Sequence, residues 1–202
     1  MWKEAAGLEL HPQNFPWDKF PWQKAIFHFA RLLGAVHTDN INLARTELKN
    51  LYASYDTLVK LKDTYKANQV MIQIKTGEAW ILFAERKLTE AVQLMNIAAG
   101  MEDKTEKSPV TPGEVLPAKE LLADMLLQLN KPAEALKAYE EDLKKHPNRF
   151  NGLYGAAVAS KKTSNVQKES FYFKQLIATA NSADSNKPEL EIARSFLKKE
   201  NR

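Results

Sequence analysis

The sequence predicts an all-α protein built from antiparallel helix hairpins. Apolar residues recur at intervals of three and four through nearly all of the chain after Pro21, which is the periodicity of amphipathic helices. The chain has only 7 glycines, and its 9 prolines are bunched in a few places. Acidic and basic residues alternate at helical spacing in segments such as 134–145, which is typical of solvated helix faces. With 202 residues, of which 44% are hydrophobic, the chain can bury a sizeable core.

Several of the predicted helices have a local reason to start or stop. Thr38 and Asp39 can cap the second helix, and His146-Pro147-Asn148 ends one helix and opens another. Pro132 and Pro188 suit the first turn of the helices that they open. The predicted helices span about 22–37, 40–60, 63–86, 88–102, 113–129, 132–145, 148–162, 166–180 and 187–199.

These helices predict two regions of unequal size. Residues 1–20 form a partial helix followed by an aromatic and proline-rich connector, and residues 21–202 form a helical repeat domain. The partial helix looks like the second arm of a hairpin, so we expect Met1 to begin a fragment, or a short paralogue, of a longer array. The repeat domain divides into hairpins at about 22–60, 63–102, 113–147 and 148–180, with a one-sided capping helix at 187–199.

One 34-residue segment, 116–149, carries a repeat pattern. Its small and large apolar positions resemble those of a tetratricopeptide repeat: Leu122, Ala123, Leu126, Ala135, Tyr139 and Pro147. The following segment resembles a second repeat, with Glu169 in place of the small alanine. The hairpins anchored on Ala44 and Ala91 are weaker matches at longer spacing. The resemblance implies a right-handed α-solenoid with irregular repeats.

The resemblance extends over about residues 20–180. The strings FPWQKAIFHFARLLGAV and HPNRFNGLYGAAVAS are similar to the C-terminal region of a group of bacterial tetratricopeptide-repeat proteins. That group is described mostly by fold, without an assigned activity. The resemblance therefore implies an architecture more than a role. Our first hypothesis is a non-catalytic scaffold that binds a partner protein or peptide on its concave surface.

In tetratricopeptide arrays the first-arm helices line a concave groove, and their outward side chains select the ligand. The groove would be acidic in the middle and basic towards its end, which suits an extended segment of complementary charge. Its acidic members have an alternative interpretation as an ordinary exposed charged face, and its aromatic member as part of the core. The candidate groove residues are Gln73, Thr76, Trp80, Glu120, Asp124, Gln128, Asn151, Tyr154, Lys161 and Lys162.

The connector holds the most unusual stretch of the chain. Two Phe-Pro-Trp copies place Phe15, Trp17, Phe20 and Trp22 close together, and such an aromatic surface can bind a peptide or a partner subunit. This surface supports a second hypothesis, that the chain is the structural or oligomer-forming end of a longer array. The alternative is a connector whose rings complete the core of the first hairpin.

The sequence carries no motif for chemistry. The absence of cysteine excludes disulfides, thiolate metal sites and cysteine nucleophiles. The four histidines show no metal-binding spacing, and no phosphate-binding loop or nucleophile elbow occurs. We therefore expect no enzyme, cofactor or metal. A third and weaker hypothesis is an enzyme or small-molecule binder with a pocket between Trp80 and Glu120.

The charge and hydropathy of the chain limit the classes of partner that we expect. The net charge of +4 is spread over helix faces, so we expect no nucleic-acid partner. The longest apolar run, 79–84, is far shorter than the ~20 residues of a spanning helix, so we expect no membrane partner. No signal core precedes the first helix, which favours the cytoplasm. The expected partner is another protein or peptide, with self-association through the aromatic surface as an addition.

Overall fold

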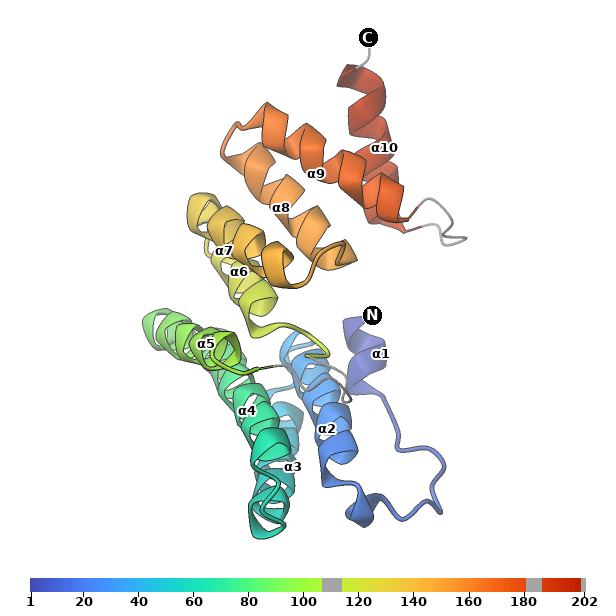
Figure 1. The fold of residues 1–202 in the computed structure, drawn as a ribbon, viewed down its shortest axis with the longest axis vertical. Helices are drawn as coiled ribbons and strands as arrows, with labels where there is room; N and C mark the ends of the chain where they lie inside the picture. The colour runs from blue at the N-terminus through green and yellow to red at the C-terminus, as the bar shows by residue number, and fades with distance from the viewer. Residues whose placement is uncertain (107–113, 181–186, 201–202) are drawn as a thin grey trace. The chain divides into compact units, whose positions relative to one another are not determined.

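The computed structural model describes residues 1–106, 114–180 and 187–200. Over these residues the protein is all-helical, with 78% of its residues in helices and no strand, as the sequence predicts. The chain divides into two compact units, Met1–Ala118 and Lys119–Arg202. Figure 1 shows consecutive helices lying side by side within each of them.

Unit 1 consists of two long hairpins and a short N-terminal helix. Its elements are α1 (Trp2–Ala6), the 3₁₀ turn η1 (Trp17–Lys19), α2 (Pro21–Val36), α3 (Ile41–Lys60), α4 (Thr64–Ala84) and α5 (Leu88–Asp103). Helix α2 packs on α1, α3 and α4, and α4 packs on α3 and α5. The predicted small anchors Ala44 and Ala91 are fully buried. An alanine at these points allows neighbouring helices to approach closely.

Unit 2 contains two shorter hairpins and a final helix. Its elements are α6 (Ala118–Gln128), α7 (Pro132–Lys145), α8 (Phe150–Lys162), α9 (Val166–Thr179) and α10 (Pro188–Glu200), of which α6 begins at the boundary residue. Helix α8 packs on α7 and α9, and α10 packs on α9. Ala135 is fully buried, and Glu169, at the equivalent position of the next hairpin, is also buried.

Five of the turns between consecutive helices share one backbone geometry. In each turn the residue after the left-handed position donates its N–H to the carbonyl five residues earlier, as Asp63 does to Leu58. This is the Schellman arrangement, which satisfies carbonyls at the end of a helix. It usually uses glycine, but here the left-handed position is occupied by residues with side chains: Asp39, Lys62, Arg86, Asn130 and Ser164.

The structure corrects two predicted helix starts. Asn40, and not Thr38 or Asp39, caps α3, because its side chain accepts a hydrogen bond from the Leu43 N–H at 3.1 Å while Asp39 is the left-handed residue of the turn. Helix α6 begins at Ala118 instead of about 113, since Pro117 disfavours the helical conformation of the residue before it. Residue 113 itself lies outside the described residues.

Candidate functional site

The candidate groove residues of unit 1 lie mostly in the interior. Thr76 and Trp80 are buried, and Gln73 is half-buried. The Trp80 ring lies 4.6 Å from the ring of His37 and 5.4 Å from that of Phe83, measured between centroids. Trp80 therefore belongs to the core of unit 1, which was the alternative interpretation of this residue.

The two acidic groove candidates in unit 2 form hydrogen bonds to other residues of that unit. Glu120 is only 1% exposed and accepts two hydrogen bonds from the Arg149 guanidinium, at 2.8 and 3.0 Å. Asp124, one turn further along α6, accepts a hydrogen bond from the Tyr139 hydroxyl on α7. Glu120 is therefore not part of an exposed acidic face, whereas Asp124 is half-buried. Pairing explains the burial of Glu120, because an unpaired carboxylate in the interior costs several kcal/mol.

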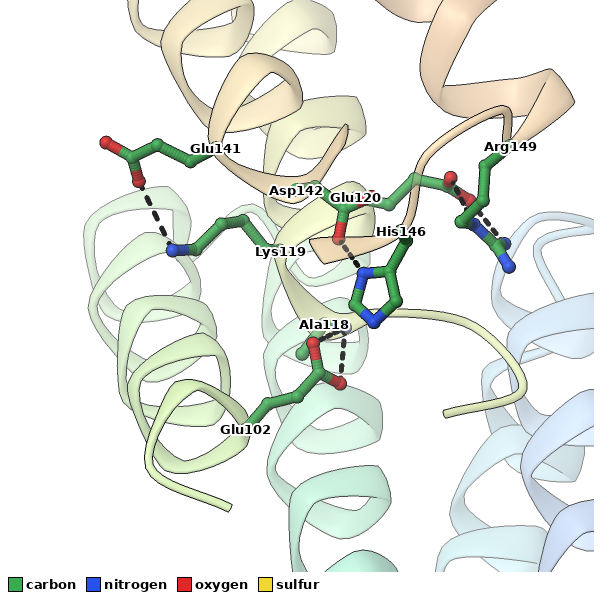
Figure 2. Close-up of polar contacts among 8 residues, drawn as sticks. All are labelled: Glu102, Ala118, Lys119, Glu120, Glu141, Asp142, His146 and Arg149. Atoms are coloured by element: carbon green, nitrogen blue, oxygen red, sulfur yellow. Dashed lines mark hydrogen bonds and ion pairs between the residues drawn. The ribbon is translucent and has the colours of Figure 1, made fainter. Parts of the chain in front are cut away.

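Arg149 reaches Glu120 because it stands directly before α8, at the N-cap position. Figure 2 shows the two nitrogens of its guanidinium facing the two carboxylate oxygens of Glu120. This two-pronged geometry is the strongest form of arginine–carboxylate pair. The pair holds the start of α8 against α6. No local pattern in the sequence indicates this pair, since the two residues are far apart along the chain.

A second carboxylate, Asp142 on α7, lies beside this pair. It is buried, and its Oδ1 lies 2.7 Å from the Nδ1 of His146. Its Oδ2 has no hydrogen-bond partner. Burial raises the pKa of Asp142, and the nearby Glu120 charge acts in the same direction. Its role in this geometry is to hold His146 at the end of α7.

Burial also raises the pKa of Asp124, to about 6. The hydrogen bond from Tyr139 opposes this shift, and the charges of Glu120 and Asp142 add to it. The cluster thus gathers three carboxyl groups, of which Glu120 is bonded to Arg149, Asp142 to His146 and Asp124 to Tyr139. Both acids that the sequence suggested for ligand contact serve internal packing.

Figure 2 shows two further polar contacts that no sequence pattern indicates. Both carboxylate oxygens of Glu102, near the end of α5, lie within hydrogen-bond distance of the Ala118 N–H, at 3.0 and 2.9 Å. Within unit 2, Lys119 on α6 pairs with Glu141 on α7 at 3.2 Å. The first contact caps the start of α6, where backbone N–H groups otherwise lack partners. A carboxylate is favoured there by the helix dipole as well.

The remaining groove candidates stay accessible. Asn151, Lys161 and Lys162 are exposed on α8, and Tyr154 is partly exposed between them. Their spacing of three, four and seven residues puts them with Val158 on one stripe of the helix. Gln128 is exposed at the end of α6. The fully exposed candidates of the predicted groove are therefore neutral or basic.

The aromatic connector is divided between surface and core. Trp22 is buried at the start of α2, whereas Phe15 and Phe20 are each 38% exposed. The Phe15 ring lies 4.8 Å from that of Trp17 and 4.9 Å from that of Phe20. Trp17 donates its indole N–H to the Pro12 carbonyl at 3.0 Å. The surface part of the candidate thus shrinks to a three-ring cluster of Phe15, Trp17 and Phe20.

Among the described residues, no group of three or more His, Asp or Glu side chains could hold a metal ion. None of the described helices is both long and apolar enough to cross a membrane. Over the described residues the protein is all-helical, and several of its buried or half-buried ion pairs join neighbouring helices, such as Glu47 with Arg31 and Glu120 with Arg149. No protein-family model, curated protein or solved structure matches it.

Proposed function

We propose that the protein is a non-catalytic interaction module of the tetratricopeptide type, whose hairpins form a right-handed solenoid. Its partner is an acidic, extended segment of another protein, bound along the exposed stripe of α8. One observation carries the choice of an acidic partner. Glu120 and Asp124 are bonded inside unit 2, so the exposed groove candidates that carry a charge are Lys161 and Lys162, while the charge of Glu189 on α10 acts on Tyr154.

The composition of the stripe supports this proposal. Asn151 can satisfy the backbone of an extended peptide with both an amide donor and a carbonyl acceptor. Tyr154 offers a ring that is partly exposed and braced by Phe173, 6.4 Å away between centroids. Rigid aromatic residues are favoured at binding surfaces because they lose little conformational entropy. The two lysines then attract the charge of the segment.

The test measures the affinity of a fluorescein-labelled peptide of alternating Glu and Ala by fluorescence anisotropy. Replacing Lys161 and Lys162 together by Glu should weaken binding about tenfold, because two attractive charges become repulsive. The matched control reverses another adjacent lysine pair of the same unit, Lys198 and Lys199, which are exposed on α10. Equal losses in both variants, or no loss in either, would contradict a site on α8.

The aromatic cluster supports a second candidate, self-association. Phe15 and Phe20 present ring area to solvent at neighbouring positions. Sedimentation velocity over a range of protein concentrations tests it. Replacing both phenylalanines by Ala should shift the protein to monomer, whereas the buried Trp22 keeps the hairpin intact. A native protein that is monomeric at every concentration would remove this candidate.

A further inference from the structure

A polar cavity of about 280 Å³ lies between α2 and α3 in unit 1. It is distinct from the α8 stripe and lies in the other unit. Side chains from the 3₁₀ turn η1, α2 and α3 form its walls: Asp18, Pro21, Lys24, His28, Asn50, Ala53, Ser54 and Thr57. Its size is near the lower end of that of ligand sites, so it suits a small molecule.

One wall of the cavity is built on a buried ionic triad. Glu47, 3% exposed, lies 2.6 Å from His28 Nδ1 and 2.6 Å from Arg31 Nε, and also accepts from Asn50 at 3.4 Å. Burial acts to raise the pKa of Glu47, but the hydrogen bonds from Arg31 and His28 outweigh it and leave the pKa below its usual value. Glu47 is therefore an ionised carboxylate, which can only accept hydrogen bonds.

This fixes the tautomer of His28. Burial lowers the pKa of His28, so the imidazole is neutral at pH 7. Since Glu47 can only accept, the single ring proton of His28 must be on Nδ1. Nε2 then carries a lone pair. It is therefore an acceptor on a residue that lines the cavity.

The hydroxyl groups of the cavity are acceptors as well. Ser54 donates its proton to the Asn50 carbonyl at 3.0 Å, and Thr57 donates to the Ala53 carbonyl at 2.9 Å. Each hydroxyl oxygen keeps lone pairs for another partner. The Lys24 ammonium is paired with Asp18 at 2.7 Å, so the charges around the cavity balance.

We propose that this cavity binds a small neutral ligand rich in hydroxyl groups, such as a polyol or a monosaccharide. His28 Nε2, Ser54 Oγ and Thr57 Oγ1 accept hydrogen bonds from its hydroxyl groups. The charge balance explains the preference for a neutral ligand. An anion would be attracted only weakly, because the Lys24 ammonium is already paired with Asp18. A cation would be repelled by the same ammonium.

The first test reads the tautomer by ¹⁵N NMR of the histidine side chains in the intact protein. The expected result is a neutral His28 protonated at Nδ1. Free neutral histidine favours the opposite tautomer, so the result is specific to the Glu47 contact. A proton on Nε2 would make that atom a donor and overturn the proposal.

The second test titrates methyl glucoside and glycerol into the protein and follows the same His28 signals. Dissociation constants of roughly millimolar are expected for ligands of this size. His28→Asn keeps a donor for Glu47 but lacks the acceptor and should weaken binding at least tenfold, while His11→Asn, at an exposed histidine, should not. The asparagine variant is followed by heteronuclear spectra of the α2–α3 backbone.

Ser54→Ala and Thr57→Val keep His28 and Glu47 and remove one acceptor each. Each should weaken glucoside binding several-fold, so the pair tests the proposal even where His28→Asn fails to fold. Absence of saturable shifts with both neutral ligands would overturn the proposal. So would tighter binding of inorganic phosphate or acetamide than of methyl glucoside.

Discussion

Gly155 on α8 lies so close to the ring of Tyr139 on α7 that no larger residue fits at this position. A Cβ at this position would lie 2.2 Å from Cζ of that ring. The ring cannot move aside freely, because its hydroxyl is bonded to Asp124. The glycine thus makes room for the aromatic residue that fills the α7–α8 contact.

Replacing Gly155 by Ala should lower the free energy of unfolding by about 2 kcal/mol or more through overpacking. Gly100 on α5 is the matched control, since a Cβ there meets nothing within 4 Å. Gly100→Ala should raise stability by about 0.5–1 kcal/mol, because alanine favours the helix. Urea unfolding followed by far-UV circular dichroism measures both. Equal effects of the two substitutions would contradict the packing argument.

Asp124 should make the protein less stable as the pH rises through its pKa. Its pKa is about 6 in the folded protein and 3.8 as a free carboxyl group, so the folded state holds its proton more tightly. The resulting stabilisation is complete below pH 3.8 and is lost as the pH rises towards 6, by at most about 3 kcal/mol.

The test compares Asp124→Asn with the native protein by urea unfolding between pH 4 and 7.5. The amide keeps an acceptor for Tyr139 and carries no charge, so the variant should gain stability relative to the native protein as the pH rises. Asp18→Asn, at an exposed carboxylate, should not show this gain. A constant difference between native and Asp124→Asn protein across the range would contradict a raised pKa.

Which individual polar residues are buried was predicted poorly from the sequence. Asn151, Lys161 and Lys162 were expected on an exposed face and are exposed. Glu120 and Asp124 share the same helical spacing and polarity, but Glu120 is buried and Asp124 is half-buried. Burial depended on partners distant in the chain, Arg149 and Tyr139, which a periodic pattern does not reveal. His28 likewise has no motif, since its partner Glu47 stands on another helix.

Helix α1 shows how a five-residue element is held in place. Its backbone lies so close to α2 that a Cβ on Gly34 would come within 2.3 Å of the Ala6 nitrogen. Its Trp2 ring stacks on His37, with centroids 4.1 Å apart, and the tilted ring of Trp80 also contacts His37, with centroids 4.6 Å apart. A helix this short is not stable alone in water, so these contacts are what order it.

The Trp2 contact predicts a change in the titration of His37. Burial lowers the pKa of His37 to about 4. Trp2→Ala uncovers the ring, so its pKa should rise towards 6.5, as histidine NMR signals can show. Trp17→Ala removes a tryptophan of the connector that contacts Phe15 and Pro12, and it should leave the pKa of His37 unchanged. An unchanged pKa in Trp2→Ala would mean that α1 does not shield His37.

The same shift predicts a loss of stability in acid. The folded pKa of His37 is depressed, so its contribution is present above pH 6.5 and is lost as the pH falls towards 4. The loss is at most about 3 kcal/mol. Urea unfolding followed by tryptophan fluorescence should show it in the native protein and a smaller loss in Trp2→Ala. Parallel pH profiles for the two proteins would contradict it.

The positions of most helices were predicted correctly from the sequence. The helices from α2 to α5 and from α7 to α10 lie where the periodicity predicts them, with ends displaced by a few residues at most. Proline marked the starts of α7 and α10 correctly, because its fixed φ suits a first turn. The start of α6 was misplaced because apolar spacing continues across Pro117, although the backbone before that proline is not helical.

In the whole molecule, the unfolding of unit 1 can be followed separately, because tryptophan occurs in that unit alone. All four tryptophans, Trp2, Trp17, Trp22 and Trp80, lie in unit 1. Tryptophan fluorescence therefore follows the unfolding of unit 1, while circular dichroism follows both units.

We expect the two units to unfold separately. Gly155→Ala, in unit 2, should move part of the circular dichroism transition to lower urea and leave the fluorescence midpoint unchanged. Gly34→Ala, in unit 1, should lower the fluorescence midpoint. A common shift of both signals in both variants would show instead that the chain unfolds as one cooperative body.

The Schellman turns make the protein less stable than it could be, because residues other than glycine occupy their left-handed positions. A residue with a Cβ is strained in the left-handed region, by roughly 1 kcal/mol or more. Lys62, Arg86 and Ser164 all stand there at helix ends. Glycine at these places would relieve the strain at a smaller cost in chain entropy. An engineer seeking a more heat-resistant version can therefore begin at the turns and leave the core, the α8 stripe and the α2–α3 cavity as they are.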